Sequence, residues 1–151
     1  MKFIADVMLG KLARLLRMAG FDTLYFGGIT DRDLMEKARS EERILLTRDH
    51  QLLKNYKIER GLFIISDVPD EQLREVILAL DLSFQENKFL SICLICNQPV
   101  KAARREEIKA NVPVRIYEAH ENFFKCLKCG RVYWHGSHYN NMKKRLKNIF
   151  H

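Results

Sequence analysis

The sequence predicts an α/β protein in which a parallel sheet, covered by helices on both faces, is followed by a small zinc-binding module. In the first 80 residues, short apolar segments alternate with amphipathic helical patterns. Strands separated by helices are expected to pair in parallel through right-handed crossovers. The four cysteines all lie after residue 90, in two C-x-x-C pairs, and this arrangement is typical of a structural zinc site.

Four strands and four helices are expected in the first part. The strands are KFIADV (2–7), DTLYF (22–26), RILLT (43–47) and GLFIIS (61–66). The helices are MLGKLARLLRMAG (8–20), DRDLMEKARSEE (31–42), DHQLLKNY (49–56) and PDEQLREVILAL (69–80). The first helix places Leu9, Leu12 and Leu16 at helical spacing, and Gly20 is suited to end it. Asp31 is expected to cap the second helix.

The composition is that of a soluble globular protein, with 47% apolar and 30% charged residues. No apolar run approaches the roughly 18 residues that cross a bilayer. The acid at position 6 in MKFIADVMLGK argues against a signal peptide. We therefore expect a cytoplasmic protein with no membrane partner, where cysteines stay reduced and more often bind metal than each other.

The charge is distributed unevenly. Residues 1–90 contain 14 Lys and Arg against 15 Asp and Glu, a balance of −1, whereas residues 91–151 contain 12 against 4, a balance of +8. This split predicts two domains, 1–90 and 91–151, with different roles. An acidic domain beside a basic one suits an enzyme that acts on a polyanion. A basic surface kept for solubility is the alternative.

An aspartate lies at the end of each predicted strand or shortly after it, at the edge of the sheet where ligands of parallel sheets bind. These residues are Asp6, Asp31, Asp49 and Asp67. Each of the last three also lies where a helix cap belongs, but Asp6 interrupts an apolar segment and capping does not explain it. Carboxylates gathered at one edge repel one another, and a divalent cation removes the repulsion. The pattern predicts a catalytic Mg²⁺ or Mn²⁺ held by Asp6, Asp31 and Asp49.

Basic residues near this edge are candidates for phosphate contacts. Lys11 and Arg14 lie in the first turns of the helix that follows Asp6, although a solvated helix face is the alternative for both. Arg17, one turn further, is expected to be solvated. Arg48 is expected to face a phosphate or the opposite face of its strand. Asp33 and Glu36 are weaker candidates for extra ligands.

The cysteine pairs predict one structural Zn²⁺ bound by Cys93, Cys96, Cys126 and Cys129. A redox C-x-x-C motif is the alternative, but it would need only one pair. Between the pairs, VPVRIYEA (112–119) reads as a strand, and a basic segment, MKKRLKNIF (142–150), closes the chain.

The segment GRVYWHGSHYNNMKKRLK after the second pair mixes aromatic rings with cations, as single-strand binding surfaces do. Trp134 is expected to stack on a base or, equally, to pack against the first domain. Ser137 and His138 are expected to contact substrate. The sequence contains no Walker A loop, no G-x-G-x-x-G and no G-x-S-x-G, so the corresponding nucleotide-binding and serine-hydrolase sites are not expected.

Four segments together resemble the Mut-seven C-terminal RNase domain family. They are FIADVMLGKLARLLRMAGFDT (3–23), ILLTRD (44–49), SDVPDEQLREV (66–76) and the two C-x-x-C pairs followed by VYWHGSH (132–138). The resemblance implies a PIN-like Rossmannoid sheet with a metal-dependent ribonuclease site, followed by a zinc ribbon. By motif, Asp6 and Asp49 are the firmest catalytic positions, Asp31 follows, and Asp67 comes last. Asn97 departs from the family, which often has glycine there, but asparagine tolerates a left-handed conformation.

The sequence therefore predicts a metal-dependent ribonuclease that hydrolyses RNA phosphodiester bonds at the aspartates, with RNA, single-stranded or structured, as its partner. One alternative is a non-catalytic RNA-binding zinc-ribbon protein, in which the acids are only caps. Another is a toxin-like PIN protein held by a partner protein. PIN-like proteins often pair, so a homodimer is also an expectation.

Overall fold

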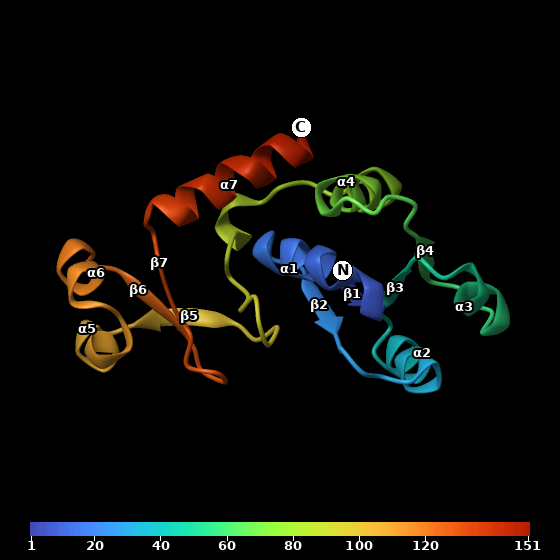
Figure 1. Cartoon of the computed structure of the whole chain (residues 1–151), viewed down its shortest axis with the longest axis horizontal. Coiled ribbons are helices and arrows are strands. Elements are labelled where there is room, and N and C mark those ends of the chain that lie inside the picture. The colour runs from blue at the N-terminus through green and yellow to red at the C-terminus, as the bar shows by residue number, and fades with distance from the viewer.

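The computed structural model describes residues 1–151 (Figure 1). The first part contains β1 (Lys2–Ala5), η1 (Val7–Leu9), α1 (Gly10–Met18), β2 (Asp22–Tyr25), α2 (Asp31–Ser40), β3 (Ile44–Thr47), α3 (His50–Asn55), β4 (Gly61–Phe63), α4 (Pro69–Leu80) and η2 (Glu86–Lys88). The second part contains β5 (Val100–Ala103), α5 (Arg105–Ile108), η3 (Lys109–Asn111), α6 (Val114–Ala119), β6 (Phe123–Cys126), β7 (Val132–Trp134) and α7 (Ser137–Phe150).

The first part is built on a four-stranded parallel sheet of order β2-β1-β3-β4. Both faces of the sheet are covered, because successive side chains of a strand point to opposite faces. Phe3 and Ala5 of β1 belong to the apolar cluster formed with α1, α4 and α7, whereas Ile4 belongs to the cluster formed with α2 and α3. All three side chains are fully buried. The expected parallel sheet with helices on both faces is confirmed.

Strand β4 is shorter than the sequence predicts, ending at Phe63 rather than at Ser66. The backbone amides of Ile65 and Ser66 donate to the two carboxylate oxygens of Glu75, each at 2.8 Å, and this draws the segment away from β3. Asp67 therefore lies on a loop, four residues beyond the end of the strand.

Local backbone conformation and capping hydrogen bonds set where two of the helices begin or end. Gly20 adopts a φ of 90° after α1, and a Cβ there would clash with the backbone oxygen of Lys88, so the expected terminator is confirmed. The cap of α2 is Thr30, whose Oγ1 accepts from the Asp33 amide at 3.1 Å. The expectation that Asp31 caps this helix is wrong by one residue.

The second part contains a three-stranded antiparallel sheet of order β5-β6-β7 and is called the ribbon below. Cys93 and Cys96 lie in the loop before β5, Cys126 ends β6 and Cys129 lies in the turn to β7. Residues 112–119 were expected to form a strand, but most of them form α6. Pro113 precedes the helix, and its carbonyl accepts from the amides of Ile116 and Tyr117 at 3.0 Å each. Proline is favoured at a helix start because its fixed φ suits the first turn. This local signal prevails over the alternation of apolar and polar residues.

The basic C-terminal segment forms α7, which extends from the ribbon across to α4 (Figure 1). Leu146 and Ile149 of α7 are buried in the same cluster as the residues of α1 and α4, so the core of the first part includes side chains from the end of the chain. On the exposed side of α7, ion pairs link it to the first part: Arg145 pairs with Asp70 of α4, and Lys143 pairs with Glu86 of η2 at 3.0 Å.

Arg17 fastens the ribbon to the sheet, and its expected exposure is wrong. The side chain is only 5% exposed, and it donates to the backbone oxygens of Thr23 at 2.8 Å and of Leu94 and Ile95 at 3.0 Å each. Leu94 and Ile95 lie between the first two cysteines. A buried guanidinium needs such acceptors, and here two of the three come from a segment 77 and 78 residues away in sequence. No helix of the structure is both long and apolar enough to cross a bilayer.

Candidate functional site

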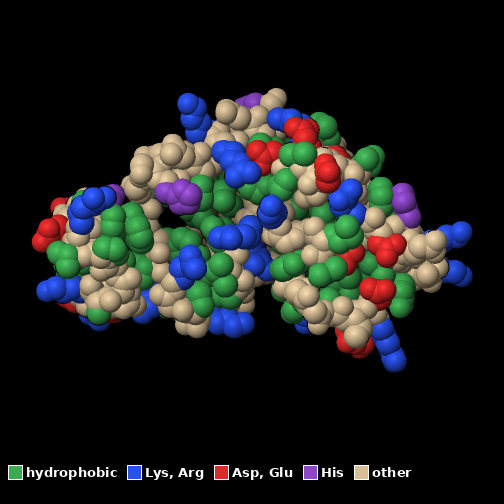
Figure 2. All heavy atoms as spheres, in the orientation of Figure 1, with side chains coloured by type: hydrophobic (Ala, Val, Ile, Leu, Met, Phe, Trp, Pro, Cys, Tyr) green, Lys and Arg blue, Asp and Glu red, His purple; other side chains and the backbone are tan.

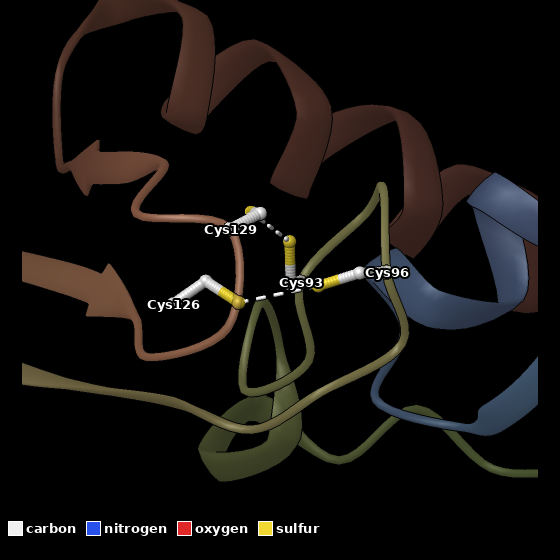
Figure 3. A group of neighbouring side chains, drawn as sticks. All are labelled: Cys93, Cys96, Cys126 and Cys129. Carbon is white, nitrogen blue, oxygen red and sulfur yellow. Dashed lines mark hydrogen bonds between the residues drawn. The ribbon is translucent and has the colours of Figure 1, made fainter.

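The four cysteines form a metal-binding group that suits zinc. Their sulfur atoms all lie within 4.8 Å of one another, and Figure 3 shows the side chains converging from two loops. The Sγ atoms of Cys93 and Cys129 are 3.7 Å apart, and those of Cys96 and Cys126 are 3.2 Å apart. Tetrahedral zinc with Zn–S bonds of about 2.3 Å separates its sulfurs by about 3.8 Å. The donor set and its spacing therefore fit Zn²⁺.

The two C-x-x-C segments have the same backbone hydrogen bond and the same left-handed residue after the second cysteine. The amide of Asn97 donates to the Cys93 carbonyl at 3.0 Å, and the amide of Gly130 donates to the Cys126 carbonyl at 2.9 Å. Asn97 and Gly130 have φ values of 59° and 74°, so both occupy the left-handed region. The expectation that Asn97 takes this conformation in place of glycine is confirmed.

Hydrogen bonds prepare one cysteine as a thiolate. Burial acts to raise the pKa of Cys93, but hydrogen bonds from Tyr133 Oη, at 3.2 Å, and from the amides of Cys96 and Ile95 outweigh it and lower the pKa to about 6. Burial raises the pKa of Tyr133, so its hydroxyl stays protonated and can donate. Burial and the neighbouring thiols raise the pKa of Cys96 to about 12, since further thiolates without a cation would repel the first. A bound cation would remove this repulsion between thiolates, so the pKa values of Cys93 and Cys96 also favour a metal site.

Asp6 lies at the carboxyl end of β1 and is almost buried, at 8% exposure. Its Oδ1 accepts from the Val7 amide at 2.6 Å and caps the short helix η1, so the expectation that capping does not explain Asp6 is wrong. Its Oδ2 accepts from the Thr47 hydroxyl at 2.8 Å. The carboxylate is thus held on both oxygens.

Thr47 connects Asp6 to Asp49 across the ends of β1 and β3. The Thr47 hydroxyl, which donates to Asp6, accepts from the Asp49 amide at 2.9 Å. Asp49 Oδ1 caps α3 by accepting from the amides of Gln51 and Leu52 at 2.8 and 3.3 Å, while Oδ2 accepts no hydrogen bond. Asp49 is exposed, so one of its oxygens is free for a ligand.

Asp31 and Asp67 are exposed on the segments that follow β2 and β4, and neither caps a helix. Asp33 and Glu36 are exposed on α2. The cysteines are the one group of three or more His, Cys, Asp or Glu residues whose ligand atoms lie within 4.8 Å of one another. Hydrogen bonds through Thr47 therefore link two of the four predicted aspartates, Asp6 and Asp49, whereas no hydrogen bond joins Asp31 or Asp67 to them.

The predicted phosphate contacts fall into two sets. Lys11 and Arg48 lie near the ends of β1 and β3, and Arg48 donates to the Ile65 carbonyl at 3.3 Å, on the loop that leads to Asp67. The other four line one pocket of about 510 Å³ between α1, α6, β7 and α7: Arg14, Trp134, Ser137 and His138. On the face of the molecule drawn in Figure 2, Lys and Arg side chains lie over the middle, whereas many of the visible acidic side chains lie over the first part.

A family model, described as the Mut7-C RNAse domain, matches residues 1–146 of the 151-residue chain. The chain belongs to the Mut7-C RNAse domain family. The resemblance inferred from the sequence motifs is thereby confirmed. No curated protein and no solved structure matches the chain. Mut7-C membership supports a nuclease-like function, and within this Mut7-C chain the cysteine group supports metal binding.

Three residues of this Mut7-C chain support the site although the sequence does not predict that role: Thr47, Glu75 and Arg17. Thr47 had a local signal, because a threonine two residues before an aspartate often forms a hydroxyl turn. Glu75 and Arg17 had none, since their partners are backbone groups that only the fold brings close.

Proposed function

We propose that the protein is a metal-dependent ribonuclease that hydrolyses RNA phosphodiester bonds at the edge formed by Asp6 and Asp49, with Mg²⁺ or Mn²⁺ as the catalytic ion. The observation that carries the proposal is the hydrogen-bonded series Asp6–Thr47–Asp49 at the carboxyl ends of two central strands, in a chain of an RNase family. Ligands of parallel sheets bind at this edge.

The donor set fits a hard divalent cation. Mg²⁺ in proteins typically contacts one or two carboxylates and keeps several waters and a substrate phosphate. Asp6 would supply a fixed ligand, because hydrogen bonds to both oxygens hold its carboxylate. Asp49 would supply its free Oδ2. Asp31 and Asp67, exposed on the adjoining segments, would complete the ligand set through water or directly. Such an ion supplies an activated water and steadies the charge of the phosphate under attack.

The basic residues have a role in this reaction that follows from their position. Lys11 lies on α1 shortly after Asp6, is exposed and pairs with no acid. It would contact the phosphates that flank the cleaved bond. Arg48, beside Asp49, would stabilise negative charge there while its bond to the Ile65 carbonyl keeps the loop of Asp67 close. The zinc, in contrast, would shape the ribbon and take no part in bond cleavage.

Cleavage of an end-labelled RNA with and without added Mn²⁺ tests the proposal. A chelator is unsuitable for the metal-free arm, because it would also remove zinc from the ribbon. We expect cleavage only with added ion, and its loss in Asp6→Asn/Asp49→Asn. Asp81→Asn is the matched control, because Asp81 is exposed, makes no ion pair and has a left-handed φ of 50° that asparagine accepts. Cleavage without the ion, or equal cleavage by both variants, would refute the proposal.

A non-catalytic RNA-binding protein is the second candidate, and one observation favours it. Capping by Oδ1 accounts for both Asp6 and Asp49, and the carboxylates do not gather as the cysteines do. This candidate predicts RNA binding without a divalent ion and intact RNA in every sample.

A further inference from the structure

The pocket between α1, α6, β7 and α7 is called the groove below. It has a volume of about 510 Å³, within the range of small-ligand sites. Its walls come from both parts of the chain. No Asp or Glu lines it, and its arginines and histidines are Arg14, Arg115, Arg131, His120 and His138.

The three arginines of the groove are free. Arg14, Arg115 and Arg131 are exposed and form no ion pair or hydrogen bond with another side chain or with the backbone. Other arginines of the ribbon behave differently: Arg104 pairs with Glu107, and Arg105 donates to two backbone carbonyls. Unpaired cations that converge on one concave surface create a positive potential, and a polyanion is the ligand that such a surface attracts.

The groove also has an aromatic wall. Trp134 lines it, and the ring also packs on the apolar cluster around Phe123, which belongs to the ribbon and not to the first part, against which we expected it to pack. Gly136 lies against the ring: a Cβ at this position would be 3.1 Å from Trp134 Nε1. Packing on the Phe123 cluster and the close approach of Gly136 together limit the positions of the ring before any ligand binds. An aromatic face presented beside cations is how proteins bind unpaired bases, at about 1–3 kcal/mol per stacked base.

We propose that the groove binds a single-stranded segment of the RNA, with phosphates on Arg14, Arg115 and Arg131 and a base against Trp134. Identifying the ligand as RNA rests on the proposed function. A duplex keeps its bases stacked inside and offers mainly its backbone to proteins, whereas a loop or a single strand can place a base in a pocket. The groove also lies close to the edge formed by Asp6 and Asp49. Arg14, which lines the groove, lies one turn after Lys11 on α1, and residues three apart on a helix are neighbours. A strand held in the groove would extend past Lys11 to Asp6.

Trp134 is the only tryptophan of the chain, so its fluorescence reports on the groove directly. The experiment titrates the zinc-loaded protein with an oligouridylate, without added Mg²⁺ or Mn²⁺, at several salt concentrations. We expect quenching of Trp134 on binding. Each phosphate contact contributes about −0.7 to the slope of log K against log salt for single strands, so Arg115→Gln/Arg131→Gln should reduce the slope by about 1.4. At 0.1 M salt this corresponds to an affinity loss of roughly 25-fold.

Lys101→Gln/Lys128→Gln is the matched control, since both lysines are exposed on the ribbon, form no ion pair and do not line the groove. It removes the same charge and should change affinity far less. Equal losses in the two double variants, binding without a change in fluorescence, or equal quenching by an RNA duplex of the same length would overturn the proposal. The fluorescence result does not depend on cleavage, because Asp6→Asn/Asp49→Asn should still show quenching. If the nuclease proposal is wrong, RNA binds and stays intact; if the groove proposal is wrong, the Arg115→Gln/Arg131→Gln variant binds RNA as its control does.

Discussion

Replacing Arg17 by methionine should loosen the ribbon from the sheet. The methionine retains most of the apolar stem but cannot donate a hydrogen bond. Three carbonyl oxygens, of Thr23, Leu94 and Ile95, would then lose their donor. The first two of these bonds are buried, and the third is partly buried.

The expected loss of stability follows from this count. A buried polar group left unsatisfied costs about 1–3 kcal/mol, and water can reach the third carbonyl in part. The variant no longer buries a charged guanidinium, and this gain offsets some of the loss. We therefore expect the free energy of unfolding to fall by about 3 kcal/mol. For a chain of this length each kcal/mol lowers the melting temperature by about 2–4 °C, so the expected decrease is about 6–12 °C.

The assay is thermal unfolding at a fixed zinc concentration, combined with amide hydrogen exchange. Arg14→Met is the matched control, because Arg14 lies on the same helix, is exposed and makes no hydrogen bond. Exchange should rise around residues 91–98 in Arg17→Met and remain unchanged in the control. A melting temperature equal to that of Arg14→Met, or unchanged exchange in this loop, would show that Arg17 does not hold the ribbon.

Three further predictions concern the site and its supports. Thr47→Val should raise the Mn²⁺ concentration needed for half-maximal cleavage about 10- to 100-fold, because Thr47 orients the proposed metal ligand Asp6. Thr47→Ser, which keeps the hydroxyl, should restore the wild-type Mn²⁺ dependence. Unchanged metal dependence in Thr47→Val would exclude this positioning role. Tyr133→Phe removes the donor to Cys93 and should weaken zinc retention in competition with a chromogenic chelator, whereas Tyr139→Phe should not. Although burial acts to raise the pKa of Asp22, its hydrogen bonds with Arg43 and Asn97 lower it below the unfolded value of about 3.9. The stability that Asp22 contributes is therefore present above about pH 4 and lost as pH falls through the folded pKa, so Asp22→Asn should destabilise the protein at pH 7 and differ less from wild type at pH 3; a difference that does not depend on pH would contradict this.

The sheet could be predicted from the sequence because its two central strands, β1 and β3, are buried on both faces and therefore read as apolar runs. The cysteine site could be predicted because two C-x-x-C pairs specify a four-sulfur group almost without regard to the fold. The left-handed Asn97 could be predicted for a similar reason, since its conformation is set within one tight loop.

The remaining features depend on contacts or on competing local signals. Arg17 is a charged residue on an amphipathic helix, and only the acceptors supplied by the ribbon make its burial favourable. The early end of β4 depends on Glu75, which lies on the next helix. At 112–119 the alternation of apolar residues indicated a strand, but Pro113 starts a helix there. The apolar neighbours of Asp6 hide its capping role, because the short helix that it caps, η1, cannot be recognised from the sequence around it.

In the proposed function, Asp49 is a ligand of the catalytic ion as well as a helix cap. The most direct measurement is the rate of RNA cleavage across a Mn²⁺ titration for wild type and Asp49→Asn, with RNA binding followed by Trp134 fluorescence in the same samples. Asparagine can still accept the capping bonds of α3, so the fold should be retained. We predict unchanged RNA affinity and a loss of cleavage of about 100-fold or more, since even residues behind the ligands contribute up to that amount. Cleavage by Asp49→Asn at the wild-type rate and at the wild-type Mn²⁺ concentration would contradict the claim and leave Asp49 as a cap alone.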